Sequence, residues 1–151
     1  MIKRWSPAPG YSESLTFTFD NPLLNEDVAY SPTHVMTVES TPFIYTTASG
    51  TEYNCYIGDD YSSSTSQGVL NIYTNQRNSN NVIERIVVQQ NIGSVVYETG
   101  SISLTATVTS YIGRYISIYG RPLNKDLYAD KNIFFLVDAA DLTVTVVPVV
   151  Q

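Results

Sequence analysis

The residue types that carry acid–base, nucleophilic or metal chemistry are sparse in this chain. His34 is the only histidine, and a catalytic histidine needs an orienting partner that no neighbouring motif supplies. The sequence contains neither a Gly-x-Ser-x-Gly nucleophile motif nor an HExxH zinc motif. We therefore predict that His34 is a loop or strand-end residue and that the protein is not an enzyme.

Cys55 is the single cysteine, which excludes an internal disulfide and any multi-cysteine zinc site. A reactive thiol needs a nearby cation or a helix N-terminus to lower its pKa, whereas the charged neighbours here are Glu52, Asp59 and Asp60. Cys55 also falls within an alternating apolar–polar run. We expect it to be a small buried hydrophobe.

Two acidic pairs, Asp59-Asp60 and Asp138/Asp141, could bind calcium or act as paired glycosidase carboxylates. Neither pair has the ligand register of an EF-hand loop, and we expect both in turns, where aspartate hydrogen-bonds its own backbone. We predict no metal and no cofactor. A small hydrolase using paired aspartates remains an alternative, and it requires two carboxylates about 5–10 Å apart in a cleft.

Tyrosines and basic residues gather in one segment. Half of the eight Lys and Arg residues fall between Arg114 and Lys131, and four of the twelve tyrosines fall between Tyr111 and Tyr128. Tyrosine and arginine are enriched at protein interfaces, although core packing of single rings and a solvated basic face are the simpler interpretations. We select as interface candidates Tyr111, Arg114, Tyr115, Tyr119, Arg121, Lys125 and Tyr128.

Composition excludes two classes of partner. Eight basic against fourteen acidic residues give a net charge of −6, which argues against a nucleic-acid binder because such proteins need a positive face. The longest apolar run is Ile133–Val137, far below the roughly 20 residues of a membrane helix. No apolar stretch follows Lys3-Arg4, so we expect no signal peptide and no membrane contact.

The hydrophobic pattern is that of strands almost throughout. Turn residues recur every eight to twelve positions, and no window shows a sustained helical period. We predict an all-β fold of mostly antiparallel sheets, a sandwich or barrel, with very short helices at Leu23–Tyr30 and Lys125–Asp130. The expected strands are Leu15–Phe19, His34–Glu39, Phe43–Thr47, Thr51–Ile57, Val69–Tyr73, Val82–Val88, Val95–Tyr97, Ser101–Leu104, Tyr115–Tyr119, Ile133–Val137 and Leu142–Val147.

Turn chemistry divides these strands. Glu98-Thr99-Gly100 predicts a tight hairpin, since glycine accepts positive φ. Gly58–Gly68 is expected to be a long polar hairpin tip, and 75–81 either a hairpin tip or a seam between two sub-units. We expect residues 1–10 to form a flexible N-terminal arm and residues 11–151 to form a single β domain.

Four segments resemble one family. Ile92–Leu104 is similar to the "G-x-V-x-Y-x-T-G-x-I-x-L" hairpin of phage baseplate wedge proteins. Tyr53–Asp60, Ile116–Tyr128 and Asn132–Val146 resemble further segments of the same proteins in the same order. Together they resemble the C-terminal part of the ring-forming wedge subunit of T-even-like contractile tails, over roughly residues 11 to 150. That subunit is much longer, so the chain is either a fragment or a shorter relative.

The resemblance implies a structural virion protein that mediates subunit–subunit assembly in the phage tail baseplate. It would be made in the host cytoplasm, form homo-oligomers in the assembled tail, and contact other copies of itself and neighbouring wedge proteins. No cofactor or catalytic residue comes with it. The alternative interpretation is a carbohydrate-binding β-sandwich module that uses exposed tyrosines and the acidic turns.

Overall fold

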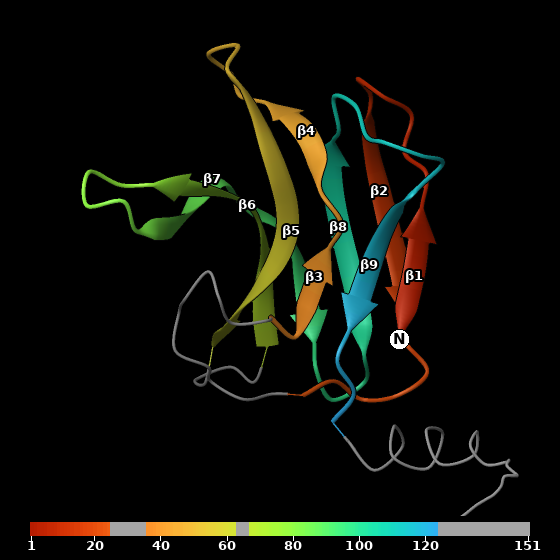
Figure 1. Cartoon of the computed structure of the whole chain (residues 1–151). Coiled ribbons are helices and arrows are strands. Elements are labelled where there is room, and N and C mark those ends of the chain that lie inside the picture. Colours follow the sequence, from red (N-terminus) through yellow and green to blue (C-terminus); the bar gives the residue numbers. More distant parts are fainter. Residues whose placement is uncertain (25–35, 63–66, 124–151) are drawn as a thin grey trace, which may run out of the picture.

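The computed structural model describes residues 1–24, 36–62 and 67–123, and within these ranges the chain is entirely β (Figure 1). All strand pairs are antiparallel, and the sheet order is β1-β9-β3-β5-β6-β7-β8-β2, with β4 pairing β5 outside this path. The described residues contain no helix. The strands are β1 (Ile2–Trp5), β2 (Ser12–Thr18), β3 (Val38–Ser40), β4 (Phe43–Thr46), β5 (Glu52–Ser62), β6 (Gln67–Arg77), β7 (Ile83–Val96), β8 (Ser101–Thr107) and β9 (Ile116–Gly120).

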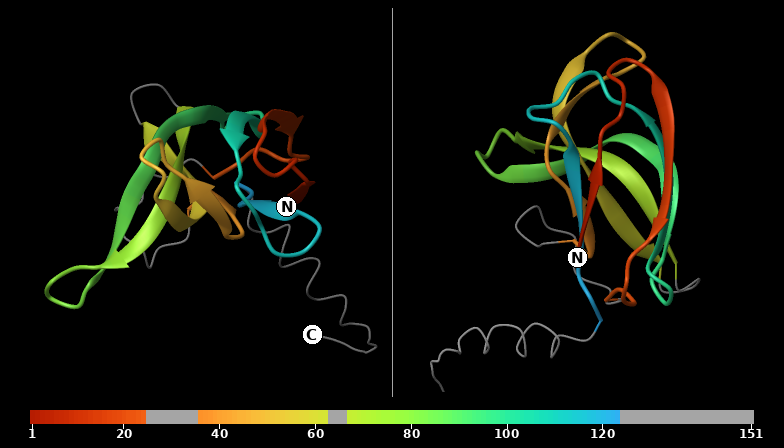
Figure 2. Two further views of the ribbon diagram at one scale, coloured as in Figure 1. Left: turned by 90° about the horizontal axis from the view of Figure 1, so that it is seen from above. Right: turned by 90° about the vertical axis from the view of Figure 1, so that its right-hand side faces the viewer.

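The sheet curls into a nearly closed barrel. Its two end strands, β1 and β2, form no ladder with each other, but Lys3 Nζ lies 5.6 Å from the centre of the Phe17 ring. This contact joins the ends through a cation and an aromatic face. The views in Figure 2 show the curvature of the sheet around its interior. The predicted all-β, barrel-like class is confirmed.

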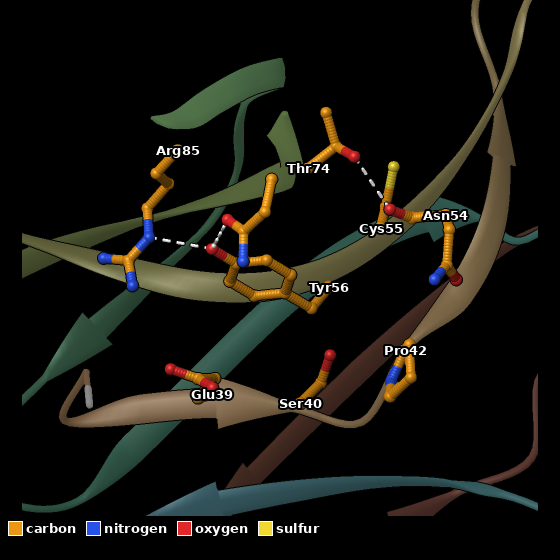
Figure 3. A pocket seen from close by; sticks show the side chains of 9 residues that line it. Glu39, Ser40, Pro42, Asn54, Cys55, Tyr56, Thr74 and Arg85 are labelled. Atoms are coloured by element: carbon orange, nitrogen blue, oxygen red, sulfur yellow. Dashed lines mark hydrogen bonds between the residues drawn. The ribbon is translucent and has the colours of Figure 1, made fainter. Parts of the chain in front are cut away.

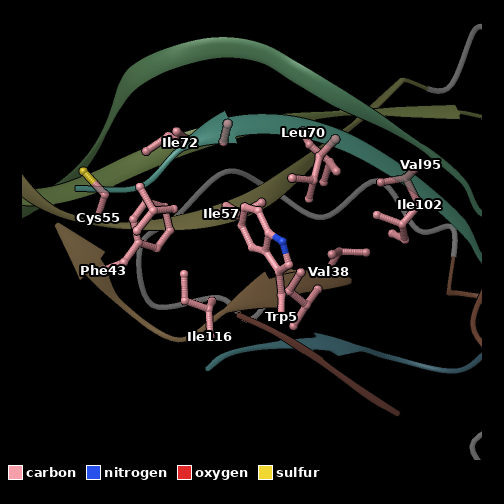
Figure 4. Packing of buried hydrophobic residues seen from close by; sticks show 14 of the residues in the cluster. Trp5, Val38, Phe43, Cys55, Ile57, Leu70, Ile72, Val95, Ile102 and Ile116 are labelled. Carbon is pink, nitrogen blue, oxygen red and sulfur yellow. The ribbon is translucent and has the colours of Figure 1, made fainter. Parts of the chain in front are cut away.

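Alternation along each strand places one set of side chains inside the barrel. Cys55 and Ile57 of β5 lie in the core with Leu70 and Ile72 of β6, and all four are fully buried (Figure 4). Each buried aliphatic side chain stabilises the fold by roughly 1.5–3 kcal/mol. Cys55 is therefore the buried hydrophobe that its alternating pattern predicts, and burial raises the pKa of its thiol to about 11.

The prediction of a flexible arm over residues 1–10 is wrong for Ile2–Trp5, which form a strand. Ile2–Trp5 forms β1, which pairs with β9 from Ile2↔Tyr119 to Trp5↔Ile116, and Trp5 is buried in the core. The following residues are also held, because Tyr111 Oη donates a hydrogen bond to the Pro7 carbonyl at 2.8 Å. The buried indole of Trp5 adds apolar contacts to the backbone pairing with β9 that orders this short segment.

The long strands run further than their apolar runs predict. The two separate runs expected at 82–88 and 95–97 belong to β7, a strand of 14 residues. Its pairing with β6 shifts register near Leu70 and Ile72. Opposite this irregularity Asn91 has φ 61°, and its N–H donates to Asn71 Oδ1 at 2.8 Å. The irregularity lets one strand continue where polar residues interrupt the pattern.

Two expected loops are shorter than predicted. The polar tip predicted at 58–68 is largely strand, since β5 continues to Ser62 and β6 begins at Gln67. Strand β6 continues to Arg77, so the segment at 75–81 ends in the hairpin turn between β6 and β7. The hairpin expected at Glu98-Thr99-Gly100 is confirmed, with Gly100 at φ 78° and Val96 paired with Ser101.

Several predictions concern residues that the structure does not describe. These are the predictions for His34, for the acidic pair Asp138/Asp141, for the strands at 133–137 and 142–147, and for the short helix at 125–130. Of the helix expected at 23–30, only Leu23 and Leu24 are described, and Leu23 forms a β-bridge with Pro122. Within the described ranges no helix is long and apolar enough to cross a membrane.

Candidate interaction surfaces

Tyr111 and Tyr115, two of the interface candidates, line a groove at one end of the barrel. The groove has a volume of about 400 Å³ and also contains Phe43 and Ile44 of β4. A bridge between Ile44 and Ser110 holds β4 against the segment that follows β8. Ile112, at the rim, is 97% exposed. The groove therefore places two of the interface candidates beside apolar side chains of β4.

A second part of the cluster lies on the outer face of β1 and β9. Tyr119 is 45% exposed and lies opposite Ile2. Tyr115 is 39% exposed, and the Arg4 guanidinium lies 5.0 Å from the centre of its ring. The structure therefore brings Tyr115 and Tyr119 to one face, next to a basic residue that the sequence analysis did not select. Arg4 was missed because the first ten residues were expected to be an arm.

The basic candidates are more scattered. Arg114 is exposed in the loop before β9, where its carbonyl accepts a hydrogen bond from Ser6 Oγ at 2.8 Å. Arg121 is half-buried just after β9. Strand β9 ends at Gly120, directly before Arg121-Pro122, as the missing N–H of proline predicts. Lys125 and Tyr128 lie outside the described residues.

A polar cleft is lined by residues of β3, β5, β6 and β7 (Figure 3). It has a volume of about 360 Å³ and contains Glu39, Tyr56, Asn75 and Arg85. Arg85 Nε donates to Tyr56 Oη at 2.8 Å, and Tyr56 Oη donates to Asn75 Oδ1 at 2.9 Å. Burial raises the pKa of Tyr56, and the Arg85 guanidinium opposes this shift. The polar side chains in the cleft form a connected hydrogen-bond network, in which the bond from Arg85 to Tyr56 joins β7 to β5.

The prediction that Asp59 lies in a turn is wrong. Asp59 is part of β5, and its side chain points into the barrel. It is 8% exposed. Its carboxylate accepts hydrogen bonds from Val38 N–H at 2.8 Å and Tyr97 Oη at 2.7 Å. Burial raises the pKa of Asp59, and these two hydrogen bonds partly oppose the shift. Asp59 thus links β3, β5 and the turn after β7 through one buried carboxylate.

Asp59 and Asp60 do not converge on a common site. They are consecutive residues of a strand, so their side chains point to opposite faces, one buried and one exposed. Within the part of the chain that the structure describes, no three His, Cys, Asp or Glu residues gather closely enough to hold a metal ion. The paired-aspartate arrangement is therefore not formed at this position.

The feature that sequence reasoning missed is a projecting hairpin, which we call the β6–β7 arm (Thr74–Ile86). Strand β5 pairs with β6 only as far as Tyr56↔Tyr73, and β8 pairs only with the last residues of β7. Beyond these points β6 and β7 continue as a two-stranded ribbon that stands away from the barrel in Figures 1 and 2. The signal in the sequence was the β-branched run at 82–88 that follows an asparagine-rich turn.

The tip of the β6–β7 arm is held in one conformation. Asn78 Oδ1 accepts hydrogen bonds from Asn80 N–H at 2.9 Å and Val82 N–H at 3.0 Å. Asn78 Nδ2 donates to Glu84 Oε2 at 2.6 Å, and Asn81 adopts φ 63°. An asparagine is suited to this role because its side chain can satisfy turn amides, and another asparagine tolerates the left-handed conformation.

Comparison with known proteins gives no relative: no protein-family model, no curated protein and no solved structure matches the chain.

Proposed function

We propose that the chain is a structural assembly domain, and that it serves as a baseplate wedge component of a contractile phage tail. The β6–β7 arm carries the assembly part of this proposal. An isolated two-stranded ribbon is marginally stable in water, and this one exposes Val82 (56%) and Ile83 (42%) at its end. A projecting ribbon whose turn is held by side-chain hydrogen bonds and whose tip is apolar is suited to contact a neighbouring protein.

The baseplate part of the proposal rests on the resemblance of four segments in order. Three of them include described strands: Tyr53–Asp60 lies on β5, Ile92–Leu104 spans the end of β7 through β8, and Ile116–Tyr128 begins with β9. They lie on strands of one sheet, so the quoted segments belong to a common structural framework. In this role the chain would contact further copies of itself and neighbouring wedge proteins.

Removal of the apolar tip tests the assembly function. The double substitution Val82→Ser and Ile83→Ser should weaken association with the assembly partners co-purified from tail particles by about tenfold. The melting temperature should stay within a few degrees, because both side chains are exposed. Val69→Ser on the 36%-exposed position of β6 is the matched control. Unchanged association of the double variant would contradict a role for the arm.

Localisation tests the baseplate role separately. Antibodies against the chain, applied to purified tail particles from cells that encode it, should label the baseplate end in electron micrographs. Labelling elsewhere on the particle, or absence of the chain from the particles, would overturn the baseplate proposal.

The groove lined by Tyr111 and Tyr115 favours a second candidate, a carbohydrate-binding module. Tyrosine rings beside the Asn54 amide could stack on a sugar ring and hydrogen-bond its hydroxyls. Binding on a glycan array that is lost in Tyr115→Ala would support this candidate. An array without binding would remove it.

A further inference from the structure

Arg4 lies at the rim of the groove that contains Tyr111 and Tyr115. Ser117 lines this groove, and in the pairing of β1 with β9 it lies directly opposite Arg4. Side chains of directly opposite residues project from the same face of a sheet. Tyr115 also lines the groove, and the Arg4 guanidinium lies 5.0 Å from the centre of its ring. The strand pairing and the ring contact therefore agree in placing the Arg4 side chain beside the groove.

The charges at this rim are positive and available to a ligand. The exposed Arg4 side chain forms no hydrogen bond or ion pair with a residue that the structure describes. A guanidinium held by an aromatic ring keeps N–H donors for a ligand, and its planar fork matches a carboxylate. Arg114, one residue before Tyr115, is also exposed, and no acidic residue of the described chain lines the groove. In a chain with a net charge of −6, this rim is complementary to a carboxylate.

The groove itself fits a compact polar ring. Its volume of about 400 Å³ lies within the range of roughly 300–1,000 Å³ that is usual for small-molecule sites. Tyr111 and Tyr115 supply aromatic rings, and Asn54 and Ser110 supply hydrogen-bonding groups. A sugar offers both an apolar ring face and hydroxyls to such a surface.

The backbone around the groove is already paired, which argues against an extended peptide as the ligand. Ile44 N–H donates to the Ser110 carbonyl at 2.8 Å, and Thr109 N–H donates to the Ile44 carbonyl at 2.9 Å. Thr41 N–H donates to the Ser117 carbonyl at 2.9 Å. A peptide that adds to a sheet as a strand needs unpaired backbone groups. A ligand held by side chains, such as a sugar, is therefore favoured.

We propose that the groove and Arg4 together bind a uronic acid, a sugar that carries a carboxylate on its ring. The sugar ring lies in the groove against Tyr111 and Tyr115, and its carboxylate accepts hydrogen bonds from the Arg4 guanidinium. This inference rests on the second candidate function, carbohydrate binding, and names the class of sugar. It does not depend on the assembly role of the β6–β7 arm, because Thr74 is distant in sequence from Arg4 and no residue of the arm lines the groove.

Sugar binding by the full chain tests the assignment. Oligomers of galacturonic, glucuronic and mannuronic acid are compared with oligomers of the neutral sugars galactose, glucose and mannose by isothermal titration calorimetry. At least one acidic oligomer should bind about tenfold or more tightly than its neutral counterpart. This preference should decrease as salt is added, because salt screens the attraction between exposed charges.

Substitution of Arg4 tests its role in the preference. Arg4→Gln should weaken binding of the acidic oligomer about tenfold or more, and binding of the neutral oligomer should stay unchanged. The melting temperature should stay within a few degrees, because the side chain is exposed. Arg77→Gln, at an exposed arginine of the β6–β7 arm, is the matched control and should bind like wild type.

The outcomes separate this inference from carbohydrate binding itself. Equal binding of acidic and neutral oligomers, or undiminished binding of the acidic oligomer by Arg4→Gln, overturns the uronic-acid assignment and leaves carbohydrate binding in place. Absence of binding to every oligomer overturns the assignment together with the carbohydrate candidate, and it leaves the assembly proposal unaffected.

Discussion

Asp59 shows how one residue joins distant parts of the chain. Its sequence neighbours indicate a polar turn, but the carboxylate lies inside the barrel and accepts hydrogen bonds from Val38 and Tyr97. A buried carboxylate is costly when it is charged unless hydrogen bonds compensate. Tyr97 in turn depends on Gly68, because a Cβ atom there would clash with the Tyr97 hydroxyl. These residues form one packed unit.

The raised pKa of Asp59 predicts a pH-dependent stability. The folded protein holds this proton at pH values where the unfolded chain, with an ordinary carboxyl pKa of about 4, has lost it. The contribution of Asp59 to the free energy of unfolding is therefore largest below about pH 4. It declines as the pH rises through the raised pKa of the folded protein.

Asp59→Asn should remove this decline. Its amide can accept from Val38 N–H and donate to Tyr97 Oη, so the packing is kept. Denaturant unfolding at a series of pH values should show the variant gaining stability relative to wild type as the pH rises. Asp20→Asn, an exposed change outside β5, should keep the wild-type slope. Parallel pH profiles for Asp59→Asn and wild type would contradict the assignment.

At the scale of elements, the β6–β7 arm differs from the rest of the sheet. Elsewhere each long strand has neighbours on both sides or packs its inner face on the core. The end of the arm has neither, so its conformation depends on the turn hydrogen bonds of Asn78 and on cross-strand pairs such as Arg77↔Ile83. The conformation of the tip therefore depends on local hydrogen bonds, whereas that of the barrel also depends on core packing.

Asn78→Ala should loosen the arm tip without unfolding the barrel. Loss of three side-chain hydrogen bonds at an exposed turn should cost about 1–2 kcal/mol locally. Amide hydrogen exchange at Asn80 and Val82 should accelerate about tenfold. Exchange in β5 and β8 should stay as in wild type. Asn80→Ala is the control, because only the Asn80 backbone takes part in these hydrogen bonds. Equal protection of the tip in both variants would refute this role of Asn78.

At the scale of the whole molecule, β1 completes the barrel although it is only four residues long. Met1 and Gly120 are joined by two hydrogen bonds, one from Gly120 N–H to the Met1 carbonyl at 2.9 Å and one from the Met1 amino group to the Gly120 carbonyl at 3.2 Å. Trp5 contributes its indole to the same core as the strands from the middle of the chain. The N-terminal residues are therefore part of the folding unit.

Trp5→Ala should destabilise the protein by about 3–5 kcal/mol, the usual cost of removing a buried aromatic side chain. Deletion of residues 2–5 should destabilise it at least as much. The exposed substitution Tyr11→Ala, at a position 71% exposed, is the control and should change stability little. Thermal unfolding followed by circular dichroism provides the measurement. A deletion without effect would restore the interpretation of residues 1–10 as a flexible arm.

The interface candidates could be predicted only in part. The sequence selected Tyr115 and Tyr119 as interface candidates, and both side chains are exposed on one face. That they bind a partner stays a prediction. The sequence could not identify Arg4, which is over a hundred positions away and reaches Tyr115 only because β1 pairs with β9. It also could not identify the β6–β7 arm, since a run of β-branched residues indicates a strand but not which of its edges is left unpaired.

Local pattern alone determined the all-β class, the burial of Cys55 and the hairpin at Gly100. These properties follow from side-chain alternation and turn chemistry, which act over a few residues. Tertiary structure alone decided the order of the strands, the insertion of β1, the burial of Asp59 and the projection of the β6–β7 arm. Each of these depends on which segments of the chain pair with one another. Backbone hydrogen bonds between strands are nearly the same for many sequences, so the packing of the whole core selects the pairing partner.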